Sequence, residues 1–145
     1  MLGDVSMENL ENRAAVSGKD NVGGIAGYVG GTGGAYGTMK LNAWKNGGAV
    51  SGSGSYVGGI AGELHCTPSF GDETVQMYDS ENTGAVSGKT YVGGIFGYAV
   101  TDSKASVIER ASCRAAVTAE AVAGCIAGKA EYVTLNSCTN GGSTL

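Results

Sequence analysis

The side chains of this chain that could take part in nucleophilic or acid–base chemistry are few. His65 is the only histidine, and it stands next to Cys66. Adjacent side chains in an extended segment point to opposite faces, so this thiol and this imidazole are poorly placed to form a catalytic dyad. We therefore interpret His65 as a surface histidine in a loop.

Paired carboxylates occur at Asp72/Glu73 and at Asp79/Glu81. Glycosidases use two carboxyl groups that lie several ångströms apart across a sugar. The positions of these pairs along the chain do not show that geometry, so we predict no catalytic residue.

Two glycine-rich strings look like phosphate-binding loops. The segment 83–90, TGAVSGKT, has Thr83 where the pattern G-x-x-x-x-G-K-[ST] requires glycine. It is also one copy of a repeated unit, in which the positions equivalent to Lys89 hold Lys19, Ser53 and Glu120. The segment 30–37, GGTGGAYG, has Tyr36 where G-x-G-x-x-G requires its third glycine, and it lacks the aspartates of calcium-binding repeats. We interpret Lys89 as an exposed variable residue and 30–37 as a flexible loop, and we predict no cofactor.

The four cysteines are Cys66, Cys113, Cys125 and Cys138. They have no C-x-x-C spacing, and zinc sites need closely spaced ligand pairs, so we predict no metal site. Cysteine behaves as a small buried hydrophobe, and we expect free thiols. A disulfide between Cys113 and Cys138 is the alternative, if these two residues lie on neighbouring layers.

The composition indicates which kind of elements position these residues. The chain has 145 residues, which fits one domain; 27 are glycine and one is proline. Glycine inside a helix costs ~1 kcal/mol relative to alanine, and collagen needs glycine at about every third position with abundant proline. Hydrophobic residues make up 42% and charged residues 15%, the reverse of a disordered composition. We expect an ordered, glycine-rich and β-rich domain.

Charge and the length of the apolar stretches exclude two classes of partner. The net charge is −4 and no basic run is present, so we expect no nucleic acid partner. Apolar stretches are short and broken by glycine, so we expect no membrane insertion.

The first residues lack the basic and apolar regions of a signal peptide, and the last ones interrupt a repeat. We therefore expect the chain to be excised from a longer protein.

An internal repeat dominates the sequence. Four segments align, at 12–27, 46–62, 82–97 and 113–128, and a fifth begins at Asn140. Their anchor valines are 34, 36 and 31 residues apart, at Val16, Val50, Val86 and Val117. We predict a single repeat domain over 1–145 with units at about 7–40, 41–76, 77–107 and 108–134, and a partial unit at 135–145.

Each unit predicts three short strands separated by turn-forming residues. The first strand carries Met7, Leu41, Met77 or Ile108, the second is AVSG, and the third is VGGIAG. One unit alone buries almost nothing, whereas stacked units pair their strands in parallel and align their valines and isoleucines into columns. The isoleucine column is Ile25, Ile60, Ile95 and Ile126. The sequence therefore predicts an all-β parallel β-solenoid (β-helix) of about 4.5 coils, with three short strands per coil.

Glycine and asparagine recur at fixed places in the unit. We expect some glycines to adopt positive φ at corners, and Gly23 and Gly24 to let backbone approach backbone. Stacked asparagines are expected to form an amide ladder; they are Asn12, Asn46, Asn82 and Asn140.

The segment 104–131 is alanine-rich and by itself is typical of a helix. Its string AAVTAEAVAGCIAG, however, matches AVSGKTYVGGIFG of the third unit. We therefore expect a strand-bearing coil here, with a terminal helix as the alternative.

The pattern N-x-G-x-V-x-G followed by V-G-G-[IL]-x-G resembles the GLUG-motif repeat family of bacterial surface and adhesin-like proteins, including repeat regions of IgA-peptidase-like proteins. The motif is carried by 46–62 and 82–97, and the fourth copy departs from it at Cys113 and Ala119. The resemblance covers about residues 7–145. It implies a right-handed parallel β-solenoid at the bacterial cell surface or outside the cell, and no catalytic residue.

Insertions all fall between VGGIAG and the next unit, which places them along one edge of a solenoid, often the binding edge. We predict that these loops bind a ligand through Tyr28, Tyr36, His65, Phe70 and Tyr98. An equal alternative is that Tyr28 and Tyr98 cover the end of the core.

Together these observations predict a non-catalytic surface module that acts in adhesion or as a rigid display stalk. Its partners would be a host glycan or an extracellular protein, with end-to-end contacts to adjoining domains of the parent protein. Two alternatives stay open. One is a fragment of a carbohydrate-active or peptidase surface enzyme, because parallel β-helix folds include polysaccharide lyases and hydrolases. The other is a spacer with no ligand.

Overall fold

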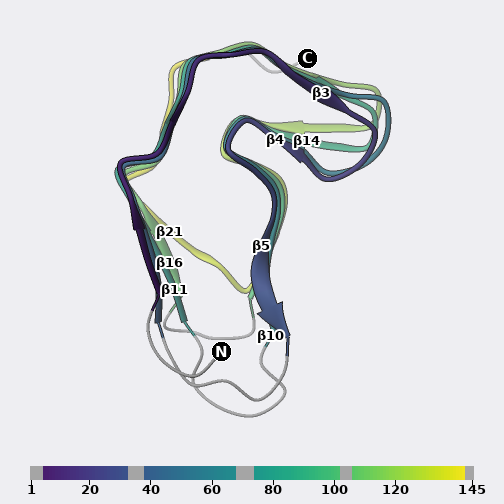
Figure 1. The fold of residues 1–145 in the computed structure, drawn as a ribbon. Coiled ribbons are helices and arrows are strands. Elements are labelled where there is room, and N and C mark those ends of the chain that lie inside the picture. Colours follow the sequence, from purple (N-terminus) through teal and green to yellow (C-terminus); the bar gives the residue numbers. More distant parts are fainter. Residues whose placement is uncertain (1–4, 33–37, 68–73, 102–105, 143–145) are drawn as a thin grey trace.

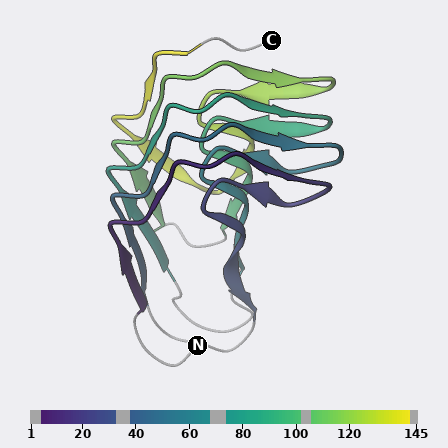
Figure 2. The same cartoon turned by 45° about the horizontal axis from the view of Figure 1, so that its top comes forward.

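The computed structural model describes residues 5–32, 38–67, 74–101 and 106–142. Every regular element in these residues is a β-strand, and none is a helix. Seen along its axis, the chain follows the same outline in each repeat (Figure 1). The tilted view shows these outlines stacked as separate coils (Figure 2). The all-β class and the parallel β-solenoid are therefore confirmed.

Two five-stranded parallel sheets form one side of the stack. The β1 sheet contains β1 (Val5–Glu8), β6 (Thr38–Asn42), β11 (Thr74–Tyr78), β16 (Val107–Glu109) and β21 (Thr134–Asn136). The β2 sheet contains β2 (Glu11–Asn12), β7 (Lys45–Asn46), β12 (Glu81–Asn82), β17 (Ser112–Cys113) and β22 (Thr139–Asn140).

Three four-stranded parallel sheets complete each coil. The β3 sheet contains β3 (Val16–Gly18), β8 (Val50–Gly52), β13 (Val86–Gly88) and β18 (Val117–Ala119). The β4 sheet contains β4 (Val22–Gly23), β9 (Val57–Gly58), β14 (Tyr91–Gly93) and β19 (Val122–Gly124). The β5 sheet contains β5 (Ala26–Thr32), β10 (Ala61–Thr67), β15 (Phe96–Thr101) and β20 (Ala127–Glu131).

Each repeat therefore contributes five strands, and the prediction of three is wrong. The asparagine position, which lies outside the three predicted strands, forms a two-residue strand of its own. VGGIAG is split in two, because the chain bends between the VG strand and the AG strand. The second half then continues as a strand into the predicted insertion.

The corners also differ from expectation. Positive φ recurs between the β1 and β2 sheets at non-glycine residues: Asn9, Ala43, Asp79, Arg110 and Ser137. No described glycine adopts a φ in the left-handed region. The glycine columns instead allow close backbone approach, as predicted. A Cβ atom on Gly58, for example, would overlap the Ala61 carbonyl oxygen and come within 2.7 Å of the Gly97 nitrogen.

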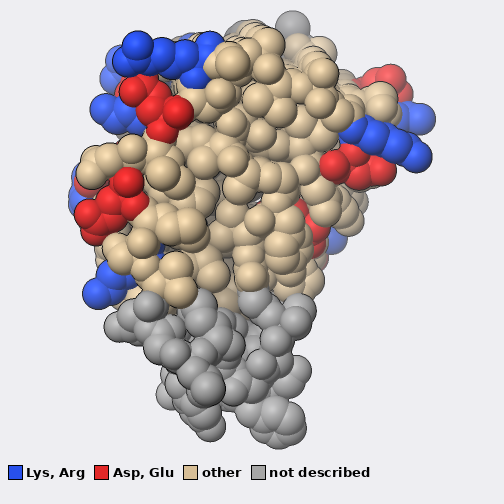
Figure 3. Space-filling model, in the orientation of Figure 1, with Lys and Arg blue, Asp and Glu red and all other residues tan. Residues whose placement is uncertain are grey.

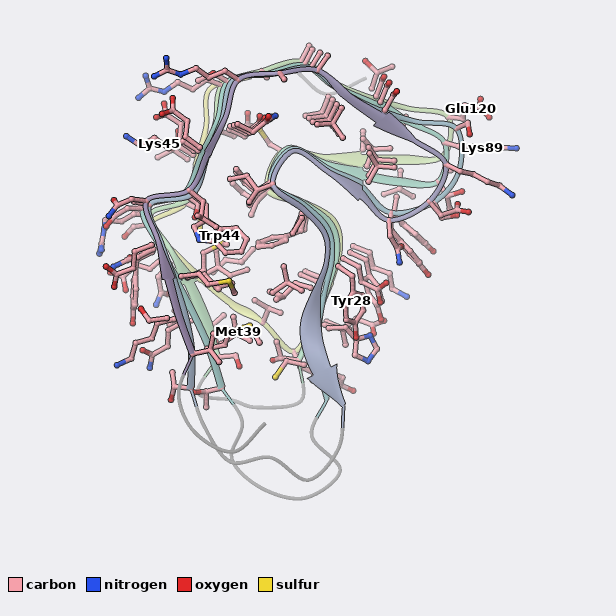
Figure 4. All side chains as sticks on the ribbon, in the orientation of Figure 1. Tyr28, Met39, Trp44, Lys45, Lys89 and Glu120 are labelled. Carbon is pink, nitrogen blue, oxygen red and sulfur yellow. The ribbon has the colours of Figure 1, made fainter. Side chains whose placement is uncertain are left out.

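The interior of each coil has two parts, which we call the lobe and the arm. The lobe lies between the β1 and β5 sheets and holds the largest buried side chains, Trp44, Phe96 and Leu41 among them. The arm lies between the β3 and β4 sheets and holds a cluster of valines with Cys113 and Cys125. Figure 4 shows Trp44 and Met39 inside the lobe, and Lys89 and Glu120 at the tip of the arm.

The predicted columns are present. The anchor valines pair in register, Val16 with Val50, then Val86, then Val117. The amide ladder is also confirmed in the first three coils: Asn12 Nδ2 donates to Asn46 Oδ1, and Asn46 Nδ2 donates to Asn82 Oδ1, each at 2.8 Å. Cys113 occupies the next rung, in register with Asn82.

The alanine-rich segment after residue 106 forms a coil of strands, from β16 to β20, so its interpretation as a repeat is confirmed. Its strands continue all five sheets of the preceding coil. None of the described residues forms a helix long and apolar enough to cross a membrane.

Candidate functional site

The outer face of the β5 sheet gathers aromatic and charged side chains. Along β10, Leu64 and Cys66 are fully buried, while the alternate residues Glu63 and His65 are part-exposed. Because the strands of the β5 sheet pair in register, their outward-facing residues form two columns along the stack. One column is Tyr28, Glu63, Tyr98 and Lys129, and the other is Gly30, His65, Val100 and Glu131.

The first half of this face contains Tyr28, Glu63 and His65, which we call the Tyr28 cluster. The rings of Tyr28 and His65 stack with centroids 6.4 Å apart, and His65 Nδ1 lies 3.1 Å from Glu63 Oε1. Tyr28 is 46% exposed. Burial, together with the nearby Glu63 carboxylate, raises the pKa of Tyr28. The cluster thus offers an open ring beside a carboxylate and an imidazole.

The second half of the face is closed by its own contacts. The Tyr56 ring stacks on Tyr91 and on Tyr98, at 5.8 and 5.3 Å between centroids. Lys129 Nζ lies 5.7 Å and 5.4 Å from the centres of the Tyr91 and Tyr98 rings. Glu131 accepts a hydrogen bond from the Tyr98 hydroxyl at 2.8 Å and pairs with Lys129 at 2.9 Å. Burial and the bond to Glu131 raise the pKa of Tyr98.

The structure brings three of the five predicted site residues to one face: Tyr28, His65 and Tyr98. Each lies within a strand of the β5 sheet and none lies in a loop, because strand pairing continues past the repeat motif into the predicted insertions. The interpretation of His65 as a loop residue is therefore wrong. Tyr36 and Phe70 lie outside the described residues.

Sequence reasoning missed Glu63, Tyr56, Lys129 and Glu131 on this face. The signal was present in the alternation that follows the motif: in 63–66, ELHC, polar residues at the outward positions alternate with buried Leu64 and Cys66. That period-two pattern is typical of a half-buried strand.

Tyr28 also borders a hollow of about 320 Å³ at the first coil. Its walls are apolar and belong to the lobe, with Met7, Leu10, Met39 and Trp44 among them. Viewed along the axis, charged side chains lie on the outer rim of the molecule, and the end of the stack carries few of them (Figure 3). The structure thus leaves the end of the lobe core near Tyr28 partly open.

The acidic pair Asp79/Glu81 lies at the corner between the β1 and β2 sheets. Asp79 accepts hydrogen bonds of 2.6 and 3.2 Å from Arg110, and Glu81 lies 3.9 Å from Arg114. The bond from Arg110 lowers the pKa of Asp79. A general acid needs a raised pKa instead, so this carboxylate is suited to an ion pair. Asp72 and Glu73 lie outside the described residues.

The string 83–90 forms part of the arm. Val86 is buried in the valine column, and Lys89 is exposed at the tip of the arm (Figure 4). The Lys89 backbone nitrogen donates to the Gly54 carbonyl at 3.2 Å, and the Lys89 carbonyl accepts from Glu120 and Ala121. These backbone groups serve coil stacking, which agrees with the interpretation of Lys89 as an exposed, variable residue.

None of the four cysteines forms a disulfide bond in this structure. Cys113 belongs to the arm cluster, whereas Cys138 packs against the lobe cluster and its thiol contacts the carbonyls of Ile108 and Asn136. The alternative of a Cys113–Cys138 disulfide therefore finds no support in the packing. Among the described residues, no group of three or more His, Cys, Asp and Glu side chains is arranged to hold a metal ion.

Comparisons with protein-family models, with curated proteins and with solved structures found no match to this chain.

Proposed function

We propose that this chain is a non-catalytic repeat module that acts in adhesion at the bacterial cell surface or outside the cell, where the stacked coils form a stiff stalk. The observation that carries the proposal is the Tyr28 cluster on the outer face of the β5 sheet. Two residues predicted from separate insertions, Tyr28 and His65, stack there beside a carboxylate. Their position on a sheet held by parallel pairing on both sides of β10 makes this surface rigid.

The chemistry of the cluster favours a glycan. An open tyrosine ring provides an apolar face for the C–H face of a sugar, while a carboxylate and an imidazole provide hydrogen-bond partners for hydroxyl groups. Tyr28 is the most exposed ring of the face. The rings of Tyr56 and Tyr98 are covered by one another and by Lys129, so they support the face and do not offer a free ring. An extracellular protein is the other partner that such a surface could bind.

The finer architecture belongs to this proposal. We propose a right-handed solenoid of about 4.5 coils, because connections between parallel strands of one sheet are right-handed in about 98% of cases. Membership of the GLUG-motif family is proposed on the repeated motif alone. End-to-end contact with adjoining domains stays a prediction.

Glycan-array and host-matrix binding test the proposal. We expect Tyr28→Ala and His65→Ala each to weaken binding at least tenfold, without a change in the circular dichroism spectrum. The matched control is Tyr78→Ala, which removes a tyrosine from the outer face of the opposite β1 sheet, where Arg110 covers the ring at 5.6 Å. Binding that is equally weak in Tyr78→Ala, or unchanged in Tyr28→Ala, would refute the role of the β5 face. If no glycan or matrix protein binds the unmodified chain, the spacer alternative is correct.

A further inference from the structure

The fourth coil departs from the other coils at two positions of the neck, the narrow passage between lobe and arm. In the first three coils the neck is lined by the asparagine ladder and by the glycine column Gly24, Gly59 and Gly94. In the fourth coil Cys113 takes the place of asparagine, in register with Asn82. Cys125 follows Gly124, which pairs with Gly93, so it takes the place of the column glycine. Both replacements are cysteine.

The two cysteines lie together in the arm core. Cys113 is fully buried and Cys125 is 8% exposed, and both belong to the valine cluster. The Cys125 thiol donates to the Cys113 carbonyl oxygen at 3.6 Å. A Cβ atom on Gly94 would overlap both the Cys113 sulfur and the Cys125 carbonyl oxygen, and would come within 2.8 Å of the Cys113 Cβ. The side chain of Cys113 and the backbone of Cys125 therefore both pack against Gly94.

From this geometry we propose that Cys113 and Cys125 form a disulfide bond across the neck of the fourth coil in an oxidising environment. The amide ladder links the necks of the first three coils, from Asn12 through Asn46 to Asn82. At the next rung the Cys113 thiol makes a weak local contact with the Ala115 carbonyl at 3.8 Å in place of a ladder amide. A covalent bond within the fourth neck would hold the two sides of that coil together. The proposal depends on the neck alone and not on the ligand-binding face.

The reaction needs an oxidant, for which a low-molecular-weight disulfide such as oxidised glutathione is sufficient. One cysteine thiolate attacks the glutathione disulfide, forms a mixed disulfide and releases one glutathione thiolate. The second cysteine then attacks the protein sulfur of the mixed disulfide and releases the second glutathione. One disulfide forms, one breaks, and the protons of the two cysteine thiols end on the two glutathione molecules.

Burial of the Cys125 thiol determines at which stage of folding the disulfide forms. Burial raises the pKa of the Cys125 thiol to about 12, and only the thiolate is the nucleophile. The folded protein should therefore react slowly at neutral pH. We expect the bond to form during folding, before the arm core closes.

Peptide mapping after refolding tests the proposal directly, because trypsin separates all four cysteines. Cleavage after Arg110, Arg114 and Lys129 places Cys113 in peptide 111–114 and Cys125 in peptide 115–129, while Cys138 follows residue 129 and Cys66 lies in 46–89. The protein is refolded with oxidised and reduced glutathione, its free thiols are alkylated, and the digest is analysed without reduction. We expect 111–114 linked to 115–129, with Cys66 and Cys138 alkylated.

Thermal unfolding provides the second readout. The oxidised protein should have a Tm about 5–10 °C higher than the reduced protein, because the cross-link restricts the unfolded chain. Cys138→Ser should keep this difference. The double variant Cys113→Asn/Cys125→Gly restores the neck residues of the first three coils; it should fold and show no difference between oxidised and reduced samples. Alkylation of Cys113 and Cys125 after oxidative refolding, or a cross-link to Cys138 instead, would overturn the proposal.

Discussion

The lobe and the arm are built from the same repeats but follow different packing rules. In the arm, the anchor column is valine in every coil. In the second and third coils the neighbouring Gly52 and Gly88 leave little room for a Cβ atom beside the valines. In the lobe, one column changes from coil to coil. This column consists of the residue directly before each strand of the β2 sheet: Leu10, Trp44, Ser80, Ala111 and Cys138.

The difference follows from the distance between the walls. In the arm and neck of the first three coils the backbones approach closely, so each inward position holds the same residue. In the lobe the walls are far apart, and a large residue in one coil can fill space beside small residues in the next. Phe96 lies between Ala61 and Ala127 in its column, for example. The arm of the first three coils therefore keeps the same residue at each inward position, whereas the lobe requires only that the total volume is filled.

The largest expected effect is in the lobe, at Trp44. This side chain is 1% exposed, and its Nε1 donates to the Met7 carbonyl at 3.0 Å. We expect Trp44→Ala to lower the free energy of unfolding by about 3–5 kcal/mol, because it leaves a cavity and an unpaired carbonyl. Urea denaturation measures this loss.

The control for Trp44 is its counterpart in the first coil. Leu10 occupies the same column but is 37% exposed, so Leu10→Ala should cost about 1 kcal/mol or less. If both variants lose the same stability, burial in the lobe does not determine the effect, and the comparison between lobe and arm fails.

These packing rules also explain which parts could be predicted from sequence. The arm and the ladder repeat the same residues at the same spacing, so Val50, Asn46 and Gly24 were assigned to their columns correctly. Trp44 was not recognised as a core residue, because its equivalents Leu10 and Ser80 differ from it in size and polarity. The residues of such a column need only fill the total volume together. Their types therefore differ from coil to coil, and an alignment of the repeats does not reveal the column.

The candidate site was predicted only in part for a related reason. Tyr28, His65 and Tyr98 were selected as aromatic and imidazole side chains in insertions, and they do share one face. Their strands were missed, because pairing with β5 of the preceding coil extends β10 over the seven residues Ala61–Thr67. The partner strands for this pairing come from other repeats. The sequence of a single insertion therefore does not show that the insertion begins as a strand.

The second prediction concerns the neck at Gly59. A Cβ atom there would overlap the Gly94 carbonyl oxygen and the side-chain amide of Asn82. Asn82 belongs to the amide ladder, and Gly94 donates its own N–H to the Gly124 carbonyl at 3.0 Å, so a shift of either residue disturbs a hydrogen bond between coils. We expect Gly59→Ala to destabilise the protein by about 3 kcal/mol, at the upper end of overpacking effects, as measured by the urea midpoint.

Gly47 offers the matched control, since it is a glycine of the same repeat beside the ladder. A Cβ atom there would meet Thr83 Oγ1 only at 3.7 Å and the Asn12 carbonyl oxygen at 3.9 Å. Gly47→Ala should therefore be neutral, or stabilise the protein by ~0.5 kcal/mol through the unfolded state. If both variants lose the same stability, then the backbone preference of glycine, and not the width of the neck, explains why glycine occurs in these columns.

The smallest effect comes from a pair of conservative substitutions, which sharpens the comparison most. Leu41 lies in a lobe column between Met7 and Met77, so Leu41→Met should cost less than about 1.5 kcal/mol. Val86 lies in the arm between Val50 and Val117, where Val86→Leu adds one methylene group and should cost about 1–3 kcal/mol. Thermal unfolding of the two variants side by side measures the contrast. A larger loss for Leu41→Met than for Val86→Leu would mean that the lobe is packed as tightly as the arm, since both positions are at most 1% exposed and burial alone cannot separate them.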